Sequence, residues 1–206
     1  MELSDNISFK SASRMYEKLS KLGISKTYNE GDVIINDHTY IKSIPIVISG
    51  TIKVMRTDDD GREILLYYIK SGESCIMSFL GGLHQDTSKV KAIAEDKTEV
   101  LFIPTEKLNV LMKEYPEWLD YMFRLYHKRF EELLEVVNAI AFKKMDERLM
   151  DYLEKKVKLT GSNTISITHE QLANELGTAR VVVSRLLKQL ETEGVVELGR
   201  NKISLI

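Results

Sequence analysis

The segment TARVVVSRLLKQL, residues 178–190, has the side chains best suited to contact another molecule. A helix turns by about 100° per residue, so one side of this segment carries Val182, Val183, Leu186, Leu187 and Leu190. The opposite side carries Arg180, Val181, Ser184, Arg185 and Lys188. A guanidinium can donate two hydrogen bonds to the O6 and N7 atoms of guanine. Arg185 is therefore the strongest candidate for reading a base, and Arg180, Ser184 and Lys188 are candidates for bases or phosphates.

A second helix is predicted just before this one. Thr168 and Gln171 form a capping box, T-H-E-Q, and Gly177 ends the helix in a tight turn after which Thr178 can cap the next helix. Thr168 and His169 lie at a helix start, where backbone amides suit a phosphate.

The last residues, VVELGRNKISLI, predict a hairpin whose tip carries Arg200 and Lys202. Together with the two helices this is a winged helix-turn-helix with double-stranded DNA as its expected partner. The alternative is a winged helix that contacts only proteins, with its charges simply solvated.

The charge distribution permits this interpretation. Residues 143–206 hold 11 Lys and Arg against 9 Asp and Glu, whereas residues 1–142 hold 18 against 22, for a total net charge of −2. No apolar run is long enough to span a membrane, and the N-terminus, MELSDNISFK, lacks the pattern of a secretory signal. We therefore expect a cytoplasmic location. The single cysteine, Cys75, excludes an internal disulfide and a four-cysteine cluster within one chain.

Residues 27–104 predict a β-rich domain. Short apolar runs alternate with turn signals, a pattern typical of an antiparallel sandwich or barrel; the runs are VII, IPIVI, TIKVM, EILLYYI, VKAIA and EVLFI. The clearest hairpin tip is Asp58–Gly61, because glycine adopts a positive φ without steric cost. The apolar spacing over residues 8–22 predicts a short helix before this domain.

A long helix is expected after Pro116. One stripe repeats every three or four residues in the manner of a coiled-coil seam and predicts a parallel homodimer; it consists of Leu119, Met122, Tyr126, Phe130, Leu133, Val137 and Ile140. A flanking stripe of Trp118, Leu125 and Val136 can pack on the β-domain. The alternative is a helix buried wholly within its own chain.

Arg129 lies inside the apolar arc of this helix. A buried cation needs a partner, because an unpaired charge costs several kcal/mol. Either an ion pair or a snorkelling stem explains this arginine, or it contacts an anionic effector.

In this order the segments resemble the Crp/Fnr family of bacterial transcription regulators. The N-terminal signature is YNEGDVIINDHTYIKSIPIVISGTIKVMRTDDDGREILLYYIKSGES, and the C-terminal one is THEQLANELGTARVVVSRLLKQLETEGVVEL. The resemblance implies an α+β fold with an antiparallel β-roll like a cyclic-nucleotide-binding jelly roll (1–115), a dimerisation helix (116–142) and a winged helix-turn-helix (143–206). It also implies a homodimer, a pseudo-palindromic operator, a small-molecule effector and RNA polymerase as a partner, for which residues 56–62 are a candidate contact.

The chain departs from the family at Val181. Many members have a glutamate there, ahead of the Ser184-Arg185 pair, which caps the helix and reads a base. Two interpretations of Val181 remain open: it contacts a thymine methyl group, or it packs locally in the first turn and reads nothing. In either case we expect a half-site different from that of glutamate-bearing relatives.

The chain also departs from the cyclic-nucleotide-binding members, which clasp the cyclic phosphate with an arginine after a Gly-Glu turn. Gly72-Glu73 is present, but residues 74–94 contain no arginine, and Lys89 lacks the two-pronged geometry. We therefore expect an effector other than cyclic AMP or cyclic GMP. The candidates for its pocket are Gly72, Glu73, Cys75, Gly81, Gly82, Lys89 and Arg129, with Gly81-Gly82 as a candidate anion-binding turn.

No cofactor or metal site is identified from the pattern. Cys75, Met77, His38 and His84 are conceivable axial ligands of a haem, but the apolar run around Cys75 favours an inert buried thiol. No nucleophile–base pair or phosphate loop indicates an enzyme. Three functions compete: an effector-controlled regulator, a constitutive regulator without an effector, and a ligand-binding or scaffold protein whose winged helix does not bind DNA.

Overall fold

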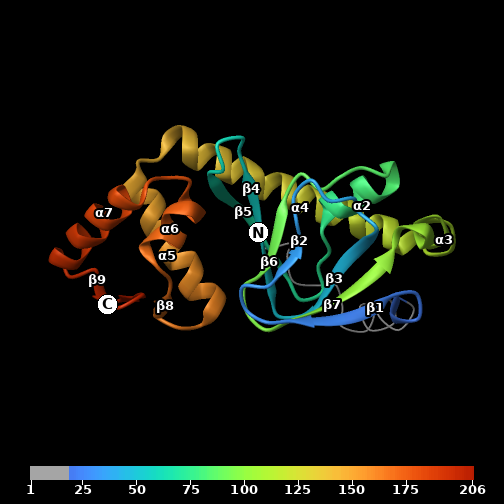
Figure 1. Ribbon diagram of the computed structural model, residues 1–206, viewed down its shortest axis with the longest axis horizontal. Helices are drawn as coiled ribbons and strands as arrows, with labels where there is room; N and C mark the ends of the chain where they lie inside the picture. The colour runs from blue at the N-terminus through green and yellow to red at the C-terminus, as the bar shows by residue number, and fades with distance from the viewer. Residues whose placement is uncertain (1–18) are drawn as a thin grey trace. The chain divides into compact units, whose positions relative to one another are not determined.

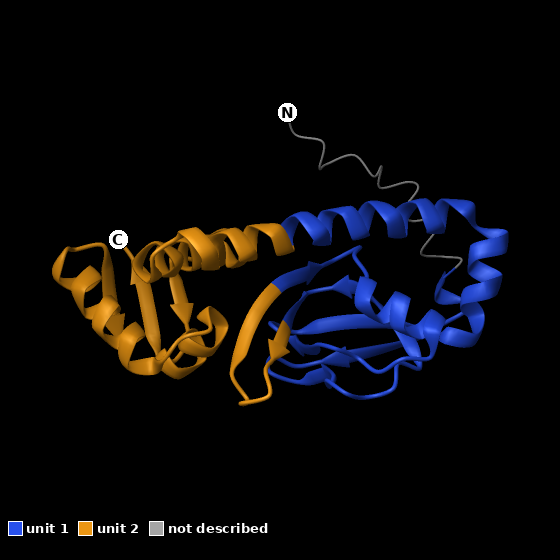
Figure 2. Cartoon of the chain, turned by 90° about the horizontal axis from the view of Figure 1, so that it is seen from above, with its two compact units in different colours: residues 1–54, 67–132 blue, residues 55–66, 133–206 orange. Residues whose placement is uncertain are grey.

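The computed structural model describes residues 19–206, and these divide into two compact units (Figure 2). Unit 1 holds the described residues up to Val54 together with Tyr67–Glu132, and unit 2 holds Met55–Leu66 and Leu133–Ile206. The helix predicted over residues 8–22 lies mostly outside the described residues, although Leu19 and Ser20 are helical.

Antiparallel strand pairs dominate unit 1, as its alternating apolar runs predict (Figure 1). One sheet has the order β1-β7-β3, in which β7 runs antiparallel to both neighbours, and the other has the order β2-β6-β4-β5. The strands of these sheets are β1 Ile24–Tyr28, β2 Val33–Ile35, β3 Ser43–Ser49, β4 Thr51–Thr57, β5 Glu63–Lys70, β6 Lys91–Ala94 and β7 Thr98–Pro104. The end of β4 and the start of β5, with the turn that joins them, belong to the segment Met55–Leu66 of unit 2.

The turn between β4 and β5 confirms the predicted hairpin tip. The Asp58 amide donates to the Arg62 carbonyl at 2.9 Å, and the Gly61 amide donates to the Asp58 carbonyl at 3.0 Å. Gly61 has φ +80°, a conformation that a residue with a Cβ rarely adopts.

The helices of unit 1 are α2 Ile76–His84, the short 3-10 turn η1 Thr105–Lys107, α3 Leu108–Glu114 and the N-terminal part of α4 Pro116–Phe142. Helix α4 has the bounds predicted for the long helix. Its Trp118 and Met122 join Phe79 of α2 and strand residues such as Ile44 and Ile103 in one core. Burial of these large apolar groups is what holds α4 against the sheets.

Unit 2 contains the C-terminal helices and a small sheet of order β8-β10-β9. Its elements are the remainder of α4, α5 Met145–Thr160, β8 Thr164–Ser166, α6 His169–Leu176, α7 Arg180–Thr192, β9 Val196–Gly199 and β10 Lys202–Leu205. Leu149, Leu153, Leu172, Val183 and Leu187 are fully buried in its core. This arrangement is the predicted winged helix-turn-helix, and with the β-rich unit 1 it confirms the α+β fold.

Over residues 19–206, no helix is both long and apolar enough to cross a membrane. Among the same residues, no three His, Cys, Asp or Glu side chains converge on a position that could hold a metal ion.

Candidate functional site

The start of α6 is fixed by the predicted capping box. The Gln171 amide donates to Thr168 Oγ1 at 3.1 Å, and the Thr168 amide donates to Gln171 Oε1 at 2.9 Å. The helix ends at Gly177, which has φ +64° and an amide bonded to the Asn174 carbonyl at 3.1 Å. His169, the first residue of α6, is therefore held in one backbone position.

Helix α7 begins differently from the prediction. Its N-cap is Ala179, whose carbonyl accepts from the amides of Val182 and Val183 at 3.0 and 3.3 Å. The Thr178 amide donates instead to the Ala173 carbonyl at 2.9 Å, so Thr178 belongs to the end of α6. The prediction that Thr178 caps α7 is wrong. The turn between the helices is one residue longer than predicted, so the N-cap position falls on Ala179.

The two sides of α7 are divided as its sequence predicts. Val183 and Leu187 are completely buried and Leu190 nearly so, while Val182 and Leu186 are half-buried. On the other side Arg180, Arg185 and Lys188 are exposed, and 77% of Val181 is accessible. Within residues 19–206, Arg180 and Arg185 form no ion pair, so their donors face outward.

Lys188 differs from the two arginines because it has a partner one turn along α7. Its Nζ lies 2.7 Å from Glu191 Oε2, and this hydrogen bond, with the Leu198 amide, lowers the pKa of the Glu191 carboxyl. An exposed pair of this kind contributes little to stability. Lys188 can therefore exchange its partner for a phosphate at small cost.

The wing is the β9–β10 hairpin, with antiparallel register Lys202↔Gly199. Arg200 and Lys202 are exposed at its tip, and Asn201 between them has φ +56°. The hairpin tip is therefore a tight turn with one exposed cation on each side of Asn201.

Three contacts that sequence analysis missed hold α6 against α5. Tyr152 Oη donates to Glu175 Oε2 at 2.6 Å, and Lys156 Nζ lies 3.8 Å from the same oxygen, all three residues being buried. Arg148 Nη2 donates to the Leu176 carbonyl at 2.5 Å. These bonds join segments far apart in sequence, so no local pattern could reveal them.

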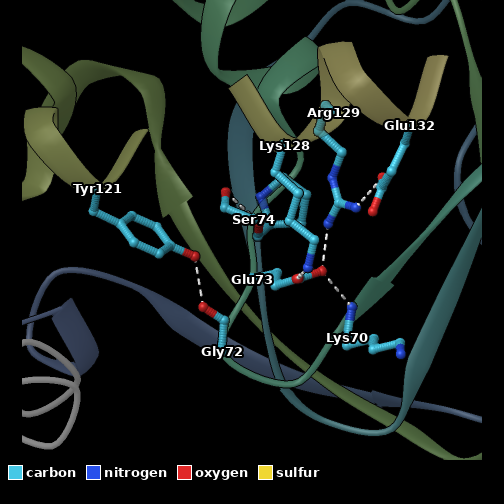
Figure 3. Close-up of polar contacts among 9 residues, drawn as sticks. Lys70, Gly72, Glu73, Ser74, Tyr121, Lys128, Arg129 and Glu132 are labelled. Carbon is cyan, nitrogen blue, oxygen red and sulfur yellow. Dashed lines mark hydrogen bonds and ion pairs between the residues drawn. The ribbon is translucent and has the colours of Figure 1, made fainter. Parts of the chain in front are cut away.

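In unit 1, the predicted effector residues Gly72, Glu73 and Arg129 come together where the turn after β5 meets α4 (Figure 3). Glu73 forms ion pairs with Arg129 and Lys128 and accepts from the Lys70 amide at 2.9 Å. Arg129 also pairs with Glu132 at 2.5 Å, and Tyr121 Oη donates to the Gly72 carbonyl at 2.5 Å. Side chains of α4 therefore clamp this turn.

Arg129 is only 2% exposed, and its guanidinium lies 4.7 Å from the centre of the Tyr67 ring. Burial acts to lower the arginine's pKa, but Glu73 and Glu132 outweigh it and raise that pKa. Burial likewise acts to raise the pKa of the Glu73 carboxyl, and Arg129 and Lys128 reverse this so that it is lowered. The ion-pair interpretation of Arg129 is confirmed. Its Nε nevertheless has no hydrogen-bond partner among the described residues.

The other predicted effector residues do not join this cluster. Gly81 and Gly82 lie inside α2. A Cβ added to Gly81 would collide with the Ile41 side chain, and a Cβ added to Gly82 would come within 2.7 Å of the Thr105 side chain. They allow close packing rather than forming an anion-binding turn, so that prediction is wrong. Lys89 is exposed and lies 3.9 Å from Asp86. Cys75 is 1% exposed, as expected of a buried thiol, whereas His38 and His84 are on the surface.

The exposed side of α4 carries an apolar stripe, which we call the α4 seam: Phe123, Tyr126, Phe130, Leu134, Val137 and Ile140. Met122, which we predicted on this stripe, is instead 1% exposed in the core of unit 1 with the correctly predicted Trp118, and Leu125 is likewise buried. Leu119 and Leu133 are half-buried. Two apolar stripes adjoin on this helix, and only contacts with the sheets decide that Met122 faces inward and Phe123 outward.

Comparisons with known proteins agree with both units. Residues 25–115 match the model of the cyclic nucleotide-binding domain, and residues 147–206 match that of the Crp-like helix-turn-helix domain. A solved transcriptional regulator assigned to the Crp/Fnr family, from Eubacterium rectale, is 30% identical, with 93% of this chain and 89% of that chain covered and a TM-score of 0.83.

Two further relatives span most of the chain. The cyclic AMP receptor protein of Thermus thermophilus is 26% identical over 180 residues, which is 87% of this chain and 82% of that protein. The c-di-GMP-responsive global regulator CLP of Xanthomonas campestris is 21% identical, with 94% and 98% of the two chains covered and a TM-score of 0.84. At that identity the likeness demonstrates a common fold only.

Proposed function

Because the chain belongs to the Crp/Fnr family of transcription regulators, we propose that it acts as a homodimer on a pseudo-palindromic operator, under the control of a small effector other than cyclic AMP. The observation that carries this proposal is the outer side of α7. Arg180 and Arg185 are exposed there without an ion pair inside residues 19–206, opposite the buried Val183 and Leu187.

Each side chain of this surface has a role that its chemistry suits. Arg185 reads guanine through two parallel hydrogen bonds, and Arg180 contacts a neighbouring base or phosphate. Val181, 77% exposed, meets a thymine methyl group, which is favoured over local packing because so little of the side chain is covered. Thr168, Thr178, Lys188, Arg200 and Lys202 contact phosphates and set the register on the duplex.

The α4 seam supports the homodimer. Phe123 is 67% exposed, Phe130 53% and Val137 61%, and these three residues follow one another at the heptad spacing of a coiled coil. Leaving such a stripe in water is unfavourable, whereas two copies packed in parallel cover it. A two-fold axis along the paired helices gives two reading helices related by symmetry, which is why the operator should be pseudo-palindromic.

The effector proposal rests on the surroundings of Glu73. Residues 74–94 offer no arginine for a cyclic phosphate, and the buried Arg129 already neutralises Glu73 and Glu132. An effector must therefore compete with, or add to, this network. RNA polymerase is the further partner that a regulator of transcription requires, and the 58–61 hairpin tip is a candidate contact.

Selection of bound duplexes from a random DNA pool, with purified protein and no ligand, tests the proposal. We expect a two-fold symmetric motif that contains guanine and thymine in each arm, with affinity that falls steeply as salt rises. Absence of enrichment both without ligand and with the small-molecule fraction of a cell extract would contradict DNA reading and favour a scaffold protein.

A second candidate is a constitutive regulator without an effector. It is favoured by the same network, because the carboxylates that meet Arg129 are already neutralised by their own chain. Operator affinity measured before and after addition of the small-molecule fraction separates the two. A change indicates an effector, and an unchanged affinity indicates constitutive binding.

A further inference from the structure

A hydrogen bond joins the two helices of the helix-turn-helix at their outer side. His169 Nδ1 lies 2.9 Å from Ser184 Oγ, linking the first residue of α6 to the second turn of α7. Both side chains are half-buried. Ser184 lies beside Val181, at the edge of the side of α7 proposed to face the bases.

Both ends of this bond are held by the surrounding fold. The Thr168–Gln171 capping box fixes the backbone of His169. Val183 and Leu187, both completely buried, anchor the turn of α7 that carries Ser184. The His169–Ser184 contact is therefore set before DNA binds.

The direction of this hydrogen bond decides what Ser184 can offer to DNA. A neutral imidazole has one N–H donor and one acceptor nitrogen. A ring at the start of α6 lies where a phosphate is expected, and a phosphate accepts hydrogen bonds. When the neutral ring donates Nε2–H to that phosphate, Nδ1 is its acceptor, so the Ser184 hydroxyl donates its only proton to Nδ1. The serine then has only lone pairs left for a base.

We propose that His169 is a positioning residue that makes Ser184 an acceptor in the major groove, so that it selects a base bearing an exocyclic amine, adenine N6 or cytosine N4. The inference rests on the DNA-binding function proposed above and specifies the base at one further position of the half-site. The opposite orientation of the bond would leave the serine proton free to donate to guanine, to thymine or to adenine N7, contacts that need no exocyclic amine, so the two orientations make different predictions.

The test uses the full chain and its selected operator. Each adenine of one half-site is replaced in turn by purine, which lacks the N6 amine, and each cytosine by its analogue without the N4 amine. Binding is measured for the wild type and for S184A, H169Q and E170Q. The H169Q substitution keeps a polar group near the former Nε2 but removes Nδ1, and Glu170 is the exposed neighbour without a contact to Ser184.

We expect one position at which removal of the amine weakens wild-type binding about threefold to tenfold, as for one hydrogen bond. E170Q should keep that preference. S184A and H169Q should both lose it, and the double variant that combines them should be no less selective than S184A, because the two residues act as one unit.

Two results would overturn this inference but leave the proposed function intact. In the first, the H169Q variant retains the preference for the amine while the S184A variant loses it. In the second, removal of any single amine leaves wild-type binding unchanged. Failure of the proposed function looks different, since the wild type would then enrich no operator and show no salt-dependent binding. That result would remove the basis of the inference as well.

Discussion

Arg129 and Arg185 lie on helices of the same chain but in opposite surroundings. Arg129 is 2% exposed and forms ion pairs with Glu73 and Glu132, whereas Arg185 is exposed and has no ion pair within residues 19–206. A buried guanidinium must be paired, because desolvation of a lone charge costs several kcal/mol. An exposed guanidinium stays hydrated, so it needs no ion pair, and its N–H donors remain available to another molecule. The first arginine therefore serves the fold and the second serves recognition.

The largest effect should follow Arg129→Met. Loss of the guanidinium removes a cationic partner from the half-buried carboxylates of Glu73 and Glu132, and we expect the free energy of unfolding to fall by about 3 kcal/mol. Urea denaturation measures it. The matched control is Lys128→Met, which removes the other cation on Glu73 but from a side chain that is 50% exposed, and should cost less than about 1 kcal/mol. Equal losses would contradict the distinction between buried and exposed cations.

Arg185→Ala should show the reverse pattern. We expect operator affinity to fall by about 2 kcal/mol with loss of guanine preference at one position, while the free energy of unfolding changes by less than about 0.5 kcal/mol. Competition binding against operators mutated at single positions measures the first effect. Arg185→Lys keeps the charge but loses the two-pronged geometry, so it should recover non-specific affinity without the preference.

Glu73 predicts a dependence of stability on pH. Its pKa is lowered in the folded protein from the ordinary glutamate value of 4.5, so its stabilisation is present above that value and is lost as pH falls through the folded pKa. Near neutral pH, Glu73→Gln should lower the free energy of unfolding by about 1.5 kcal/mol. The gap between wild type and variant in urea midpoints should close below about pH 4. A gap that stays constant from about pH 7 to about pH 3 would disprove this role.

The smallest effect concerns the exposed, uncharged member of the α7 surface. Val181→Ala should weaken binding about threefold to operators with thymine at one position, through loss of apolar contact with its methyl group. Operators with uracil at that position should bind both proteins equally. A loss of the same size that persists with uracil would instead indicate local packing of Val181 in the first turn.

Much of both units follows from local sequence patterns. The capping box at Thr168, the left-handed turn at Gly177, the hairpin at Asp58–Gly61 and the buried side of α7 were predicted, because each depends on residues within a few positions of one another. Such features arise from backbone geometry and helix periodicity. The wrong prediction at Thr178 is also local, because it misplaced the start of α7 by a single residue.

Residues whose partners are distant in sequence could not be assigned in this way. The spacing of residues along α4 was enough to establish two apolar stripes with one arginine among them. Contacts between elements were needed to settle that Met122 faces the core and Phe123 the surface, that Arg129 meets Glu73, and that His169 reaches Ser184. Periodicity and caps belong to one element and are written in its own residues. Burial and hydrogen-bond partners arise only when two elements pack together, and no local pattern specifies which pair will meet.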